Sequence, residues 1–316
     1  TLIYMHNQDM FAVIRRDMKY FTLALCVFLL ASCGGGAEEK TSGVKRDTNS
    51  SDSVEFFRSD VVERATRVFY AMPSHLELST MIKSTGGEFQ KDLMHDPQKA
   101  NTYQSTMKRA LALGVYGADL SYSAVYEQQN EALKYLAATK RIGESIGIQE
   151  AFSANFIERA NANLDNRDSM LAIMTEMYWE SNSQLEEESR EHISLLVMAG
   201  GWIEGLYLAC KLTQDVTTVD ITDRIAEQKF AADQLTEMFD VYSQDDYMTE
   251  ESYEMFKPLL AKFGELNVEI SNSSISKDES SGVHTIGGET KVELPAETLE
   301  EIKKETFALR QKLIEP

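Results

Sequence analysis

Residues 193–210 read ISLLVMAGGWIEGLYLAC, a run in which Glu204 is the only charged residue. Residues 110–126, ALALGVYGADLSYSAVY, form a second run of this kind, with Asp119 as its only charge. Helices that are apolar around most of their circumference lie at the centre of a fold. Small residues in both runs, among them Gly114 and Gly200, would let the two backbones approach closely. We therefore expect two central helices, each carrying one carboxylate.

The run at 193–210 could be mistaken for a membrane span because it is long and apolar. Glu204 lies near its middle, and a charged group is expensive in the centre of a bilayer. The adjacent pair Gly200-Gly201 also favours close packing against protein. We interpret the run as a buried core helix.

The two carboxylates are candidate site residues, because a buried carboxylate must be hydrogen-bonded, paired or protonated. One hypothesis is that Asp119 and Glu204 share an internal polar cavity that binds a metal or a small cationic or hydroxylated ligand. The other is that tyrosine, serine or arginine satisfies each carboxylate locally, so that both only fix the register of the helices. The aromatic neighbours that could take part in a ligand site are Tyr116, Tyr122, Trp202 and Tyr207.

The body around these runs, residues 53–266, has the pattern of further amphipathic helices. Five prolines and seventeen glycines in 316 residues leave few helix breakers. The expected helices are 53–72, 74–86, 96–128, 130–146, 150–163, 167–187, 190–213, 221–243 and 249–266. Pro258 should kink or break the last of them. The predicted fold is all-α, a multi-helix bundle or helical array.

The chain changes character at residues 267–294, which contain six serines and the pair Gly287-Gly288. We expect a linker or a small hairpin that turns at the two glycines. Residues 295–316 then predict a C-terminal helix that packs on the body or pairs with another helix. Its apolar stripe, at spacings of three and four, consists of Leu299, Ile302, Thr306, Leu309 and Leu313.

The formal net charge of −20 makes the chain strongly acidic. An acidic surface repels the phosphate backbone of nucleic acids and anionic lipid headgroups. We therefore exclude nucleic acid as a partner and expect no broad electrostatic docking on a membrane.

The N-terminal region has the features of an export signal. A charged start at Met18-Lys19 precedes an apolar stretch at 21–30 and small residues at a cleavage site. Ten apolar residues make a helix about 15 Å long, roughly half of the hydrocarbon thickness of a bilayer. We interpret residues 1–32 as an upstream extension followed by a signal peptide, not as a membrane anchor.

Leu30-Ala31-Ser32-Cys33 resembles the lipobox of bacterial lipoproteins. The resemblance implies a diacylglycerol on the sulfur of Cys33, cleavage before that residue, and attachment to the membrane by lipid. Residues 33–52, glycine-rich and then polar, should form a flexible tether. Glu38-Glu39 resembles the surface-export signals of Bacteroidetes lipoproteins, which favours an outward-facing protein. We expect a lipid-anchored place in the cell envelope, at the outer membrane, facing either the periplasm or the cell surface.

Cysteines and metal-ligand patterns give little further chemistry. Cys210 is the only cysteine outside the signal and the lipobox, so an internal disulfide is excluded and a small core side chain is expected. The pairs Glu188 with His192 and Asp92 with His95 each offer two ligands, too few for a metal site. We predict no metal and no cofactor.

The segments 113–122 (LGVYGADLSY) and 199–207 (AGGWIEGLY) resemble an uncharacterised family of predicted Bacteroidetes lipoproteins. The resemblance runs from about residue 55 to residue 266 and implies a cell-envelope location, but no activity, substrate or catalytic residue. We expect a lipid-anchored, non-catalytic binding or scaffolding module whose partner is an envelope protein or a small ligand. A receptor for a small ligand or metal at Asp119 and Glu204 is the alternative, and an enzyme is less favoured.

Overall fold

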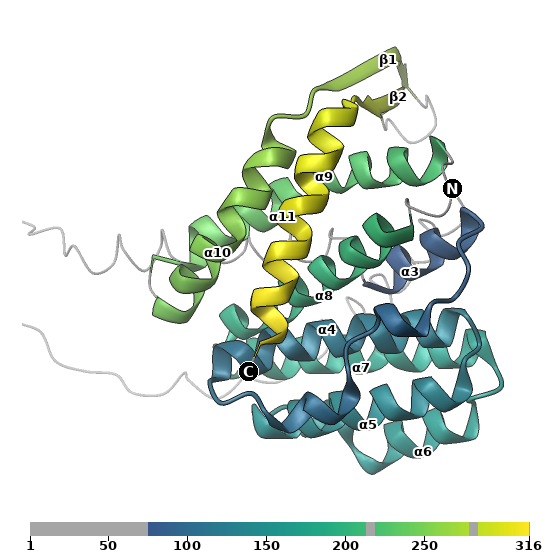
Figure 1. Ribbon diagram of the computed structural model, residues 1–316, viewed down its shortest axis with the longest axis vertical. Helices are drawn as coiled ribbons and strands as arrows, with labels where there is room; N and C mark the ends of the chain where they lie inside the picture. Colours follow the sequence, from purple (N-terminus) through teal and green to yellow (C-terminus); the bar gives the residue numbers. More distant parts are fainter. Residues whose placement is uncertain (1–74, 213–218, 245, 278–283, 316) are drawn as a thin grey trace, which may run out of the picture. The chain divides into compact units, whose positions relative to one another are not determined.

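A computed structural model describes residues 75–212, 219–244, 246–277 and 284–315. The signal peptide, Cys33, the tether and the expected helix at 53–72 lie outside these residues. Within them the protein is an all-α helical array with one small hairpin, which confirms the predicted fold class (Figure 1). The α-helices are α3 (His75–Ser84), α4 (Thr106–Val125), α5 (Gln129–Ser145), α6 (Ala154–Ala162), α7 (Arg167–Glu187), α8 (Glu191–Leu212), α9 (Val219–Tyr242), α10 (Tyr247–Gly264) and α11 (Ala296–Ile314).

The two charge-poor runs form α4 and α8, which pack directly on each other and are buried along almost their whole length. A methyl group on Gly114 would lie 1.9 Å from the carbonyl oxygen of Val197, and one on Gly200 would lie 2.0 Å from that of Leu111. No side chain fits at these distances, so the two glycines allow the close helix contact. This confirms the predicted central pair.

Helix α8 is also the one helix of the described residues that is long and apolar enough to cross a membrane. In its most apolar window 89% of the residues are buried inside the fold. The prediction of a core helix is confirmed.

Glycines with positive φ end two helices, α3 and α5, where the sequence predicted. Gly147 has a φ of +85°, and the N–H of Ile148 donates to the carbonyl of Gly143 at 2.9 Å. This is the Schellman end expected for α5. Gly86 has the same φ of +85° just beyond α3.

Two expected helices are each divided in the structure. The segment predicted as one helix from Asp96 to Gln128 begins with a short 3-10 helix, η2 (Pro97–Asn101), and α4 starts afresh at Thr106. Ser105 separates them because its backbone is extended and its side chain accepts a hydrogen bond from the N–H of Lys108. In the same way, η3 (Glu150–Phe152) and α6 replace the helix expected at 150–163.

Helix α10 contains Pro258 and nevertheless runs without a break from Tyr247 to Gly264. The expected hairpin is present as β1 (Val268–Lys277) and β2 (His284–Val292), two antiparallel strands.

The glycine pair does not form the turn of the hairpin, and that part of the prediction is wrong. Gly287 lies inside β2, opposite Ser274. The register shifts between Ser271 and Ser274, where β1 has one more residue than β2. Glycine in a strand commonly marks such a bulge, so the pair accompanies an irregularity of the ladder.

The C-terminal helix α11 packs on α8 and α10 and crosses the body in yellow in Figure 1. Ile302, Thr306, Leu309 and Leu313 of its predicted stripe are buried, and Leu299 is half-buried. We expected this helix either to pack on the body or to pair with another helix, and in the structure it packs on the body.

Candidate functional site

The central helices bring both predicted carboxylates into one buried cluster. Asp119 of α4 and Glu204 of α8 are each 0% exposed. Burial, and then the negative charge of Glu204, raises the pKa of Asp119 well above its ordinary value. Asp119 therefore keeps its proton to a higher pH than an exposed aspartate does.

Arg310 of α11 completes the cluster. Its Nε donates to Oε2 of Glu204 and its Nη2 to Oε1, both at 2.8 Å. Nη2 also donates to the carbonyl of Leu93 at 3.1 Å, and the guanidinium carbon lies 4.1 Å from the ring centre of Tyr207. The buried anion is thus paired in the fork geometry that arginine offers to a carboxylate.

The sequence analysis did not single out Arg310, although the pattern contains a signal for it. Arg310 follows Thr306 by four residues and precedes Leu313 by three, which places it on the apolar stripe of the C-terminal helix. An arginine in such a stripe needs a buried anion, and the sequence offers two.

The segment before η2 contributes His95 to the cluster. The backbone N–H of His95 donates to Oδ2 of Asp119 at 2.9 Å, and the carbonyl of His95 accepts from the hydroxyl of Tyr135 at 2.9 Å. Nε2 of the His95 ring forms a further hydrogen bond with the hydroxyl of Tyr103, at 2.8 Å. Burial, and then the charge of Arg310, lowers the pKa of His95 to about 4. The histidine is neutral at physiological pH.

One acceptor in the cluster has no donor: Oδ1 of Asp119 receives no hydrogen bond from the described residues. A proton on Asp119, shared with Glu204, would satisfy it without any ligand.

Two of the four predicted aromatic residues belong to the cluster. The ring of Tyr116 lies 5.2 Å from that of His95, and the ring of Tyr207 covers Arg310. Tyr122 is engaged elsewhere, because its hydroxyl accepts from the N–H of Gln90 at 3.0 Å. Trp202, the fourth predicted aromatic residue, also has its partner outside the cluster, because its Nε1 donates a hydrogen bond to Oε1 of Gln228 at 3.2 Å.

The metal-ligand pairs are not assembled into a site. Glu188 forms an ion pair with Arg190 at 2.8 Å, and His95 is bonded to Tyr103. In the part of the chain that the structure describes, no three metal-ligating side chains lie together. Cys210 is fully buried, and this burial raises its pKa to about 12, as suits a core side chain.

Comparisons with models of known protein families, with curated proteins and with solved structures find no significant match to this chain.

Proposed function

We propose that this protein is a lipid-anchored protein of the bacterial cell envelope, at the outer membrane, and that its helical body is a non-catalytic binding or scaffolding module. The observation that carries the proposal is the lipobox-like sequence Leu30-Ala31-Ser32-Cys33, which follows a charged start and a short apolar stretch. The membrane-span candidate of the described residues, α8, is enclosed by the core, which is compatible with an anchor made of lipid.

Lipid on Cys33 is sufficient to attach the protein to a membrane. Each buried methylene contributes about 0.8 kcal/mol, and two or more acyl chains give stable anchoring. The resemblance of segments 113–122 and 199–207 to Bacteroidetes lipoproteins supports the same location.

The state of the carboxylates supports a non-catalytic role. Glu204 is bound at both oxygens by Arg310, and Asp119 accepts from the backbone of His95. Both carboxyl groups are enclosed by protein and hold three helices together. The alternative receptor at Asp119 and Glu204 is less supported, because a cationic ligand would have to displace Arg310.

Labelling with an alkyne-bearing fatty acid in cells tests the anchor. The wild-type protein should incorporate the label and fractionate with membranes, and Cys33→Ser should do neither. Cys26→Ser is the matched control, because it removes a thiol from the signal segment and should leave labelling unchanged. Labelling that persists in Cys33→Ser, or a wild-type protein that never takes up label, would refute the proposal.

The binding role needs a second measurement. Native mass spectrometry of the protein extracted mildly from its membranes should show an envelope protein bound to it. The variants Asp119→Asn and Glu204→Gln should retain that partner if they fold. Loss of the partner or of a small molecule from folded variants would favour the receptor at the carboxylates.

A further inference from the structure

Helix α11 lies on the outside of the array and is buried along one face only (Figure 1). Five of its nineteen residues are buried, against seventeen of the twenty-two in α8. Two of the five are polar, so the buried apolar side chains are Ile302, Leu309 and Leu313. Segments with few buried apolar contacts open at a lower free energy than the core does. The packing of α11 therefore favours its separation from the body before the core unfolds.

Polar contacts hold α11 at two places. In the core, Arg310 donates to both oxygens of Glu204. Near the end of the helix, Nζ of Lys108 donates to the carbonyls of Lys312 and Glu315, at 2.7 and 2.8 Å. A buried ion pair adds little net stability, because both groups lose their hydration, and hydrogen bonds at the surface compete with water. Separation of α11 hydrates Arg310 and Glu204 together, so it leaves no buried charge without a partner.

The path of the chain permits this separation. Residues 293–295 and the hairpin of β1 and β2 join α11 to α10. The segments that link α4 to α8 all precede α11 in the chain, so its movement breaks no connection between the central helices.

The surface beneath α11 contains a thiol. Cys210 of α8 is 0% exposed, and burial raises its pKa to about 12. The charges of Lys303 and Glu300, both in α11, also act on this thiol, which places it close to that helix. A reagent in solution can reach Cys210 only after the elements that cover it have moved.

We propose that α11 is a reversible strap, which leaves the surface of α8 while α4, α8 and the helices around them stay folded. Opening uncovers a surface that includes Glu204, Tyr207 and Cys210. The closed strap keeps this surface from other molecules, and the open strap makes it accessible to them. The inference does not depend on lipid at Cys33, and its failure would leave the proposed envelope role untouched.

Thiol labelling of the full chain tests the strap. In a chain with Cys26→Ser and Cys33→Ser, Cys210 is the only thiol, and mass spectrometry can follow its reaction with N-ethylmaleimide under native conditions. Urea denaturation of the same chain gives the fraction that is globally unfolded. We expect Cys210 to react at least about tenfold faster than this unfolded fraction allows, because α11 opens on its own.

Two lysines form a matched pair in this background. Lys108→Met removes the hydrogen bonds to the end of α11, so labelling of Cys210 should accelerate about tenfold. Lys304 is exposed on α11 itself. Lys304→Met should therefore leave the rate of labelling unchanged.

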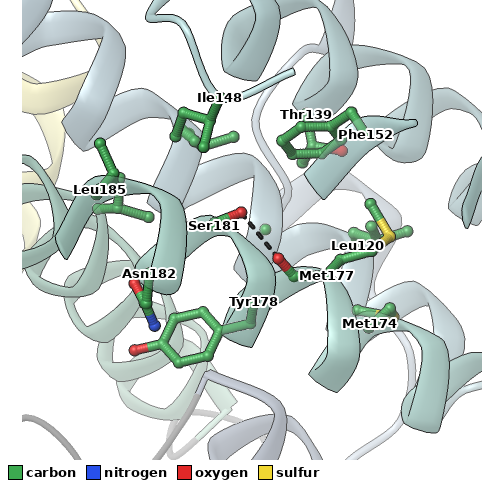
Figure 2. Close-up of a pocket in the computed structure, with 13 residues that line it drawn as sticks. Leu120, Thr139, Ile148, Phe152, Met174, Met177, Tyr178, Ser181, Asn182 and Leu185 are labelled. Atoms are coloured by element: carbon green, nitrogen blue, oxygen red, sulfur yellow. Dashed lines mark hydrogen bonds between the residues drawn. The ribbon is translucent and has the colours of Figure 1, made fainter. Parts of the chain in front are cut away.

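A variant away from α11 separates opening of the strap from global unfolding. Met177 of α7 is buried in the wall of a pocket between α4, α5, α7 and α8, which Figure 2 shows. No residue of α11 lines this pocket. Met177→Ala leaves a larger cavity and should lower the global stability. The labelling rate of Cys210 should change by less than about twofold, since the two sites are independent.

The proposal is overturned if Cys210 reacts no faster than global unfolding allows, or if Met177→Ala accelerates labelling as much as it raises the unfolded fraction. Equal rates for Lys108→Met and Lys304→Met would contradict a strap held at the end of α11. The comparison with global unfolding needs no change in α11 or its partners, so it decides the matter even if a variant fails to fold.

Discussion

Arg310 and Glu204 lie 106 residues apart in the sequence and form a two-point ion pair in the core, with both N···O distances at 2.8 Å. The pair joins the C-terminal helix α11 to the central helix α8. Arg310 also donates to the carbonyl of Leu93, so the contact includes the segment that contributes His95 to the cluster. The end of the chain is thereby fixed to the middle of the fold.

Replacing Arg310 with methionine should destabilise the protein by about 3–5 kcal/mol, because Glu204 is left buried without a counter-charge. Urea denaturation would measure the free energy of unfolding. The double variant Arg310→Met, Glu204→Met should recover most of the loss, since an apolar pair of similar volume carries no unpaired charge.

Lys312→Met is the control for that experiment, because Lys312 is exposed on the same helix. It should change stability by less than about 0.5 kcal/mol. If the double variant loses as much free energy of unfolding as the two single variants lose together, Arg310 and Glu204 are not coupled.

Asp119→Asn should cost little stability, because burial favours the neutral form of the wild-type carboxyl and the amide can likewise accept from His95 and donate to Glu204. The pKa of Asp119 is 3.8 without perturbation and is raised in the folded protein. Above pH 3.8 the unfolded chain releases a proton that the folded protein keeps, so wild-type stability falls as pH rises toward the folded pKa.

Asn cannot titrate, so Asp119→Asn should gain stability relative to the wild type over that range, by at most about 1.4 kcal/mol per pH unit. Urea denaturation at several pH values from 4 to 7 checks this slope. A difference in stability that does not change with pH would mean that Asp119 is ionised in the fold.

His95→Gln should give the opposite slope. The pKa of His95 is about 4 in the folded protein against 6.5 ordinarily, because burial disfavours the charged ring. Between these values the unfolded chain holds one more proton than the folded protein, so wild-type stability rises with pH. Relative to His95→Gln, the wild type should gain stability from pH 4 to 6.5 and then level off. A flat difference would contradict the buried, neutral histidine.

Gly114→Ala should destabilise the protein by about 3 kcal/mol or more, because the new methyl group would force α4 away from the carbonyl of Val197. Gly264→Ala is the matched change in α10, where nothing lies within 4 Å of an added methyl group. It should be neutral or slightly stabilising. Thermal unfolding of both variants measures the contrast, and equal melting temperatures would argue against the close contact of α4 and α8.

The sequence predicted the features that depend on local pattern. The runs around Gly114 and Gly200 stood out by their lack of charge, and the Schellman end at Gly147 by its glycine and the apolar residue after it. Such features depend on residues a few positions apart, so periodicity and turn chemistry are enough to find them.

The features that the sequence did not predict depend on tertiary contacts or on an ambiguous local signal. The pairing of Arg310 with Glu204 spans 106 residues, and no spacing rule links them. Ser105 begins a new helix, but serine is also tolerated inside one, so the expected helix continued through it. Gly287-Gly288 suited both a turn and a bulge, and only the strand register distinguishes these.

The N-terminal peptide of the mature protein, isolated from its native membrane and analysed by mass spectrometry, tests the proposed anchor most directly. The peptide should begin at Cys33 and carry a diacylglycerol on sulfur, with or without a third acyl chain on the new amino group. A mature protein that begins at another residue, or an unmodified Cys33, would contradict the placement of this protein in the envelope by lipid.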